Sequence, residues 1–349
     1  MVPLVRVIIV NFNGGLHLRR CVECLLRQTE ARFEAVVVDN GSTDGSLDGL
    51  PSESRLRLVR LGCNAGFAKA NNLGIEDCAT PLVALLNPDA FAEPGWLAAL
   101  VRAAEDCPSA VMFGSLQVCA DDPGLLDGAG DAYFCAGTSW RGGHRRPRPP
   151  VAPTGEAFGP CAAAALYRTD WLRRVGGFDE RFFCYAEDVD LAFRLRLAGG
   201  RCLQVADAVV AHVGSAATGK GSDFSVYHLA RNHVWTFFKC MPWPLLALLL
   251  PAHLGLVAVT LVQARKRGQA GIVARGLIDA VRAGSGIWAS RRAIQDRRRA
   301  SVREIAAAMV WSPRSLVRRA TVLRPLPTPG EAISLSDRSV ARDRLRPTL

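Results

Sequence analysis

The sequence lacks the short loops that mark three common classes of enzyme. The residues after the first predicted strand contain no GxGxxG, and neither GxxxxGK(S/T) nor GxSxG is present in the chain. Dinucleotide-binding domains, P-loop NTPases and α/β-hydrolases each depend on one of these loops. These three classes are therefore not supported, and no internal repeat suggests a solenoid or propeller.

A signal peptide and a cysteine-rich metal motif are also missing. The apolar run within residues 1–10 is short and is not followed by a cleavage pattern, so we expect the chain to start in a reducing cytoplasm. The 11 cysteines should then be free thiols. Cys21 and Cys24 form a CxxC, but no second pair or nearby His completes a zinc site. We expect this CxxC to lie on an ordinary helix face.

The net charge of +11 is not spread along the chain. Residues 264–349 hold 19 Arg and Lys against 6 Asp and Glu, whereas residues 1–263 hold 24 basic and 26 acidic groups. The nearly neutral body argues against a nucleic-acid-binding main domain. Arg297–Arg299 would fit nucleic acid, but the tail offers only Trp288 and Trp311 for stacking on bases. We expect no nucleic-acid partner.

Apolar runs alternate with helical spacing in the first 90 residues. Strands are predicted at 5–10, 35–38, 56–59 and 81–86, with helices at 16–26 and 68–75. This alternation is typical of an α/β protein with a parallel sheet. After residue 115 the pattern loosens: residues 137–155 are rich in Gly, Pro and Arg and should form a mobile loop. Regular structure is expected again at 160–168 and, as a helix, at 188–198.

Polar clusters follow three of the predicted strands, where parallel sheets bind ligands. Asp39 follows the second strand and could accept a hydrogen bond from a nucleobase imide or a ribose hydroxyl. Asp89, within Asn87-Pro88-Asp89, could hold Mg²⁺ or Mn²⁺ against a diphosphate, because hard cations take oxygen ligands. Both segments are also good turn sequences, and that simpler interpretation stays open.

A third group of acids lies at the start of the helix predicted at 188–198. Glu187, Asp188 and Asp190 follow the aromatic run at 182–185. Acids suit a helix amino terminus, which is the simpler interpretation. Three of them beside apolar rings exceed what capping requires, and such surroundings raise a carboxyl pKa toward the range of a general base.

Five motifs follow one another along residues 5–239: VNFNG at 10–14, DNGSTDG at 39–45, GFAKANNLG at 66–74, NPD at 87–89, and GGFDE at 176–180 running into EDVDL at 187–191. Taken in order, these motifs resemble those of the inverting family 2 glycosyltransferases. The resemblance implies a GT-A fold, a mostly parallel Rossmann-like sheet flanked by helices. Arg231, Asn232 and Trp235 resemble the end of the family's rhamnosyl- and galactofuranosyltransferase branch, without an assigned role.

The resemblance implies a nucleotide pocket built from five residues of the first half. Asn11 and Phe12 would line the nucleobase, and Asp39 would bond to it. Asn71 and Asn72 would lie in the stretch that closes over the nucleotide. The resemblance thus implies a nucleotide-sugar donor.

The same resemblance implies the metal ligands and the base. Asp89 would hold Mg²⁺ or Mn²⁺ with His212, whereas Asn87 stands where the family usually has the first Asp of its DxD and would make a weaker ribose contact. Asp188 would be the general base and Glu187 its supporting neighbour. Without the family, His212 would be interpreted as an ordinary strand-end histidine.

Residues 241–262 carry no charged side chain and are long enough to cross a bilayer. Pro242, Pro244, Pro251 and His253 oppose a simple crossing, and crossing would export the basic tail that begins at Arg265, against the positive-inside rule. We expect a re-entrant or in-plane segment on the cytoplasmic face of the membrane, with the tail on anionic headgroups. The alternative is a helical pair that caps the body.

These interpretations divide the chain into three parts: a nucleotide-sugar half at 1–115, an acceptor and catalytic half at 116–240, and a membrane-associated part at 241–349. The Asn87 variant resembles the branch of rhamnosyl- and galactofuranosyltransferases of the cell envelope. It favours dTDP-rhamnose as donor, with UDP-galactofuranose or another UDP- or GDP-sugar as alternatives. The acceptor is expected to be a lipid-linked glycan. The rival hypothesis is an inactive family member that serves as a membrane-bound scaffold.

Overall fold

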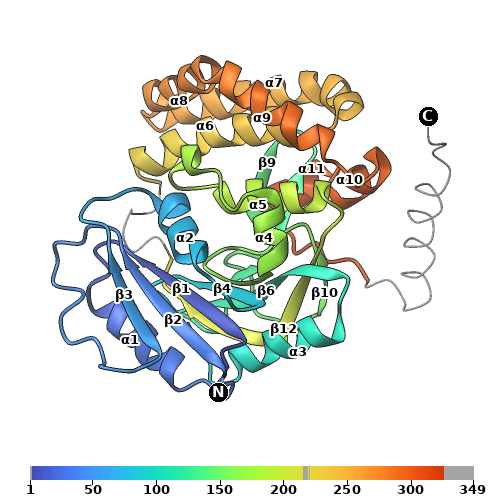
Figure 1. Ribbon diagram of the computed structural model, residues 1–349. Coiled ribbons are helices and arrows are strands. Elements are labelled where there is room, and N and C mark those ends of the chain that lie inside the picture. The colour runs from blue at the N-terminus through green and yellow to red at the C-terminus, as the bar shows by residue number, and fades with distance from the viewer. Residues whose placement is uncertain (1, 215–218, 220, 326–349) are drawn as a thin grey trace, which may run out of the picture.

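The computed structural model describes residues 2–214, 219 and 221–325 as one mixed sheet covered by helices, with a further helical layer above it (Figure 1). The strands are β1 Val5–Asn11, β2 Phe33–Asp39, β3 Leu56–Arg60, β4 Leu82–Leu86, β5 Ala90–Ala92, β6 Ala110–Cys119, β7 Leu126–Ala129, β8 Asp131–Phe134, β9 Thr138–Arg141, β10 Gly155–Ala157, β11 Ala164–Arg168 and β12 Arg201–His212. The helices are α1 Gly15–Leu26, α2 Phe67–Glu76, α3 Trp96–Asp106, α4 Thr169–Val175, α5 Glu187–Leu197, α6 Asp223–Cys240, α7 Trp243–Lys266, α8 Ala270–Arg282, α9 Gly284–Asp296, α10 Val302–Ala308 and α11 Pro313–Arg318, with a 3₁₀ turn at Glu180–Phe182.

The large sheet has the strand order β10-β12-β6-β11-β4-β1-β2-β3. Strands β3, β2, β1 and β4 are parallel neighbours, β11 is antiparallel to β4 and β6, and β12 is parallel to β6. The α/β expectation is confirmed. Strands from both halves of the predicted division at residue 115 share this one sheet.

Strand β1 shows why helices cover both faces of the sheet. All seven of its residues are buried. Alternate side chains of a strand point to opposite faces. Val7 and Ile9 pack with α1 and α3, whereas Ile8 packs with α2, α4 and α5. A continuous apolar run is therefore what this position requires. Cys21 lies on the buried face of α1, as expected for an ordinary helix.

The expectation of a mobile loop at 137–155 is wrong in part. Thr138–Arg141 forms β9, which pairs antiparallel with β8, and β10 begins at Gly155. The hairpin is ordered because Trp140 is buried and donates from its indole nitrogen to the carbonyl of Ala320. Local Gly and Pro content indicated a loop, but a buried aromatic side chain from this segment completes a core with residues distant in sequence.

Helices α6 to α9 form the layer that lies over α5 in Figure 1. Helix α7 packs Leu245, Leu246 and Leu249 into a core with Phe237, as the capping alternative predicts. Its other side is exposed. The prolines do not prevent this helix: Pro242 is the N-cap, Pro244 lies in the first turn where no donor is needed, and only Pro251 is internal.

Among the described residues, α7 is the one helix long and apolar enough to cross a membrane. Only 22% of an apolar 18-residue stretch of this helix is buried in the protein. His253 does not conflict with this character, because it stacks on Phe237 at 4.0 Å and its Nδ1 lies 2.8 Å from the carbonyl oxygen of Ala136.

Candidate active site

The ends of β1 and β2 form one buried polar corner. Asn11 lies opposite Asp39 in the parallel register. The amide nitrogen of Asn11 donates to Asp39 at 3.3 Å, to Ser42 at 2.9 Å and to Ser46 at 2.8 Å. The backbone N–H of Ser42 also donates to Asp39 at 3.3 Å. Asn11 thus fixes the loop that follows β2, and the Asp39 carboxylate is held at the carboxyl edge of the sheet.

The other predicted nucleotide residues differ in how free their side chains are. Phe12 is half-buried beside this corner. Asn71 donates back to the carbonyl of Phe67 within α2. Asn72 bonds to both the N–H and the carbonyl of Phe178, at 2.8 and 2.9 Å. The hydrogen bonds of both α2 amides therefore go to groups of the protein itself.

Asp89 and His212 are brought together by strand pairing. His212 ends β12 and lies opposite Ala90 of β5, directly after Asp89. His212 Nε2 is 3.3 Å from Asp89 Oδ1. The other Asp89 oxygen accepts from the N–H of Gly214 at 3.1 Å. Both side chains are buried at the edge where β4 ends.

Asp127, which sequence reasoning missed, holds the far side of His212. Its carboxylate lies 2.7 Å from His212 Nδ1 and also contacts Arg141 and His144. Burial alone would raise the pKa of Asp127, but hydrogen bonds to His144 and His212 and the charge of Arg141 hold it well below its usual range. The only feature of the sequence that could have indicated Asp127 is an acidic residue next to Leu126 in the short strand β7.

The donor set around Asp89 fits a divalent cation. Burial lowers the pKa of His212, but its contacts with Asp127 and Asp89 outweigh this and raise it to about 9. A cation at Asp89 would therefore have to displace the proton from Nε2. The Nε2 of His212 makes no well-aligned hydrogen bond with any residue that the structure describes. A buried imidazole nitrogen facing a carboxylate, with a second carboxylate on Nδ1, is the donor arrangement of a metal-binding histidine.

Asp188 and Glu187 open α5. Asp188 accepts from the N–H of Ala162 at 3.2 Å and of Val189 at 2.8 Å. Burial raises the pKa of Asp188 despite these bonds, which lower it. Burial and the neighbouring Asp188 charge raise the pKa of Glu187 well above its usual value. Asp188 accepts two backbone hydrogen bonds that stabilise its charged form, whereas Oε2 of Glu187 has no partner among the residues that the structure describes. Asp188 is therefore the better placed of the two to carry the charge.

A second unpredicted carboxylate lies beside Asp188. Carboxylate oxygens of Asp131 and Asp188 and the sulfur of Cys161 all lie within 4.8 Å of one another. Burial raises the pKa of both Asp131 and the Cys161 thiol. The positive charge of Arg141 acts on Asp188, Asp131 and Asp127 alike, which links the two acidic groups.

The segment before Asp188 is strained and is clamped from α6. Phe183, Tyr185 and Ala186 have backbone φ angles of 65°, 67° and 60°, which residues other than glycine rarely adopt. The side chain of Asn232 donates to the carbonyls of Phe182, Cys184 and Tyr185 at 3.1, 3.0 and 2.7 Å.

Two further contacts complete this clamp. Arg231 donates to the carbonyl of Phe182 at 3.0 Å. At Gly66, φ is +89° and a Cβ would lie 2.6 Å from the Phe183 ring. The resemblance left Arg231 and Asn232 without a role, and the structure places both against the strained segment.

Comparison with known proteins finds similarity to glycosyltransferases. The family model "Glycosyl transferase family 2" matches residues 6–176. An N-acetylglucosaminyl-diphospho-decaprenol L-rhamnosyltransferase of Mycobacterium tuberculosis is 33% identical over 263 residues, 68% of this chain and 84% of the relative. A pre-mycofactocin glycosyltransferase of the same species is 31% identical over 60% of this chain and 42% of its own length.

Solved glycosyltransferases share the fold. A mannosyltransferase from Pyrobaculum calidifontis, in complex with GDP-Man and Mn²⁺, aligns with a TM-score of 0.50 and 19% identity over 88% of this chain and 87% of its own. GalNAc-T7 with UDP, GalNAc and Mn²⁺ aligns with a TM-score of 0.54 and 16% identity over 66% of this chain. This chain spans 47% of that protein. The expected GT-A fold is confirmed.

Proposed function

The chain belongs to glycosyltransferase family 2, and from this premise we propose that it transfers rhamnose from dTDP-rhamnose to a hydroxyl of a lipid-linked acceptor in cell-envelope glycan synthesis. The mycobacterial relative, named as an L-rhamnosyltransferase acting on a decaprenol-linked sugar, supports both the donor and the acceptor class. The observation that carries the reaction type is Asp188, ionisable and held by two backbone N–H groups at the head of α5.

Asp188 acts as the general base. Its carboxylate removes the proton from the acceptor hydroxyl as the oxygen attacks the anomeric carbon, which inverts that centre in a single displacement. The raised pKa makes Asp188 a stronger base than an exposed Asp. Burial and the Asp188 charge raise the pKa of Glu187, which favours its uncharged form beside the base.

Asp89 and His212 would hold Mg²⁺ or Mn²⁺. When bound, the ion neutralises charge on the leaving nucleoside diphosphate. Asp127 fixes the His212 ring so that Nε2 faces Asp89. Asn11, Phe12 and Asp39 bind the nucleobase in this proposal.

The remaining nucleotide residues keep the roles that the resemblance implied. Asn87 approaches the ribose, and Asn71 and Asn72 shape the stretch over the nucleotide.

The acceptor is presented at the cytoplasmic face of a membrane. The outer side of α7 exposes Leu248, Leu254 and Val262, at 68%, 57% and 58% of their surface. Arg265 and Lys266 end the helix. An apolar face followed by cations suits the boundary of an anionic bilayer.

The test is donor hydrolysis by the purified protein with Mg²⁺ or Mn²⁺, across dTDP-rhamnose and a panel of UDP- and GDP-sugars. We expect slow release of dTDP from dTDP-rhamnose, lost in EDTA. Release from UDP-galactofuranose instead would replace the donor but keep the reaction. If the protein shows no turnover and no nucleotide binding, with or without an acceptor extract, this result would contradict the enzyme hypothesis and favour the scaffold.

A further inference from the structure

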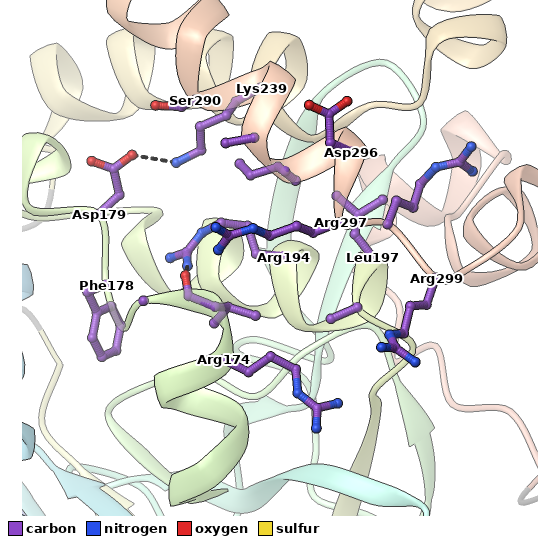
Figure 2. A pocket seen from close by; sticks show the side chains of 16 residues that line it. Arg174, Phe178, Asp179, Arg194, Leu197, Lys239, Ser290, Asp296, Arg297 and Arg299 are labelled. Atoms are coloured by element: carbon purple, nitrogen blue, oxygen red, sulfur yellow. Dashed lines mark hydrogen bonds and ion pairs between the residues drawn. The ribbon is translucent and has the colours of Figure 1, made fainter. Parts of the chain in front are cut away.

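A cavity of about 740 Å³ lies between the catalytic domain and α9, away from the groups described above (Figure 2). Its walls come from the ends of α4 and α5, from α6, and from α9 with the residues that follow it. Asp188 lies in the first turn of α5, whereas Ala198 at the cavity follows its last turn. Ten residues of helix separate the two by about 15 Å, so this cavity is distinct from the acidic group around Asp188.

The lining is strongly basic. Only two acids, Asp179 and Asp296, share the wall with the cations. The six basic residues are Arg174, Arg194, Lys239, Arg297, Arg298 and Arg299. Such an excess in one concave site attracts anions.

The acids at the base of the cavity are already neutralised. Lys239 is buried and lies 2.6 Å from both Asp179 and Asp190. Arg194 donates from Nε to Asp190 at 2.7 Å and from Nη1 to the carbonyl of Val175 at 2.8 Å. These four side chains form a charge-balanced group.

One donor of this group is left over. Arg194 is buried, and its Nη2 has no hydrogen-bond partner among the residues that the structure describes. A buried donor without a partner is costly, so a ligand that accepts from it gains affinity. In Figure 2 the Arg194 and Arg297 side chains both extend into the cavity.

The mouth arginines are positioned by backbone bonds and carry uncompensated charge. The N–H groups of Arg299 and Ala300 both donate to the carbonyl of Leu197, which ties the segment after α9 to the end of α5. Within the part of the chain that the structure describes, no salt bridge involves Arg174, Arg297 or Arg299. Cations do suit the carbonyl ends of α4, α5 and α9, but that role does not require a cavity with an unsatisfied donor at its base.

We propose that this cavity is a second anion site, which binds a phosphate or diphosphate group. Arg194 Nη2 donates from the base, and Arg297 and Arg299 close on the phosphate oxygens from the mouth. Guanidinium groups suit this ligand because their planar donors pair with two phosphate oxygens at once. The phosphate can come from a lipid headgroup or from a soluble phosphorylated molecule, since the recognition chemistry is the same.

The first experiment measures binding of inorganic pyrophosphate to the full-length protein by calorimetry, in EDTA so that no metal-dependent nucleotide site contributes. The double variant R297Q/R299Q should weaken binding at least about tenfold, the loss expected for charge-assisted contacts. The matched control R292Q/R303Q removes the same charge from exposed positions outside the cavity and should change affinity less than about twofold. Donor hydrolysis should be equal in both variants, which verifies the fold and separates this test from that of the proposed function.

A second arm distinguishes the source of the phosphate. Co-sedimentation is measured with phosphatidylcholine vesicles, with and without phosphatidylglycerol. A loss of vesicle binding in R297Q/R299Q but not in the control assigns the site to a lipid headgroup. Unchanged vesicle binding together with lost pyrophosphate binding assigns it to a soluble phosphate. Equal losses in both double variants, or binding of neither probe by the unmodified protein, would overturn the proposal.

Discussion

At the scale of single residues, the site depends on carboxylates whose surroundings differ. Burial raises the pKa of both Asp188 and Glu187, which are adjacent in sequence. The pKa of Asp127 is held in the opposite direction by two histidines and Arg141. These surroundings fit the proposed roles of a base, its neighbour and an anionic support for His212, and each role can be tested by one substitution.

We expect Asp188→Asn to lower the transfer rate by about 10² to 10⁴-fold, the range for loss of a general base. Donor affinity should stay within about twofold, because Asp188 accepts its hydrogen bonds from the backbone of Ala162 and Val189 rather than from the proposed nucleotide residues. Steady-state kinetics and calorimetry with the nucleotide measure the two effects. A parallel loss of donor affinity would contradict the assignment.

The transfer rate should depend on pH through Asp188. Its pKa is raised, and only the deprotonated form accepts a proton, so activity falls as the pH falls through that raised value. The acid limb should therefore lie above the ordinary Asp pKa of about 3.9. The profile is measured at saturating Mn²⁺, with nucleotide binding followed in parallel. A limb at about 4 would show that Asp188 is not perturbed as described.

Asp127→Asn should weaken Mn²⁺ binding about 10- to 100-fold, because it removes the carboxylate that orients His212. Calorimetric titration of Mn²⁺ measures the change. Asp121→Asn is the matched control, since Asp121 is an exposed carboxylate of the same segment that pairs with Arg145. Unchanged Mn²⁺ affinity in Asp127→Asn would refute the supporting role.

At the scale of elements, α6 holds the catalytic segment in place. Three positive φ values directly before Glu187 aim the start of α5, and the Asn232 amide compensates three carbonyls of this segment at once. Helix α6 therefore holds the segment before Glu187 through hydrogen bonds as well as through packing.

Asn232→Ala should destabilise the protein by about 2–4 kcal/mol, since it leaves buried carbonyls without their donor. It should also lower kcat more than it changes the donor KM, because Asp188 loses its fixed position. Thermal unfolding and kinetics measure both. Tyr227→Phe removes one hydrogen bond of α6, to Asp279, without touching the segment. An equal kcat loss in that control would indicate a general effect of α6.

At the scale of the whole molecule, the C-terminal helices are part of the fold and also expose an apolar surface. Leu245 and Leu249 pack with Ile305 and Phe237 in one core, so the layer cannot be removed without opening that core. The membrane hypothesis is therefore tested by substitutions on the outer side of α7 rather than by truncation.

The double variant L254E/V262E should release the protein from vesicles that contain phosphatidylglycerol. Both side chains are more than half exposed, so the fold should tolerate the charges. Two carboxylates at an anionic surface oppose both the apolar and the electrostatic contributions to binding. Co-sedimentation measures retention. Val317→Glu, at an exposed position in α11, is the control and should remain bound; equal retention of the double variant would refute docking through α7.

The sequence by itself determined the elements whose signal is local. The buried parallel strand β4 is a continuous apolar run, β1 is apolar apart from Arg6 and Asn11, and α1 carries a helical stripe, so their positions follow from local pattern. Asp89, Asp188 and His212 follow from the resemblance to the family, which implies their roles. Their use as metal ligands and base stays a prediction.

Only the tertiary structure decided what depends on distant partners. Asp127 and Asp131 belong to a segment without a recognisable motif, and their role arises because β7 and β8 lie against β12 and the start of α5. Hairpin β8–β9 is ordered by burial of Trp140 rather than by its own propensity. The basic cavity needs α5 and the residues after α9, about a hundred positions apart, to meet. Local pattern reports periodicity, whereas burial and charge pairing depend on which elements the fold brings into contact.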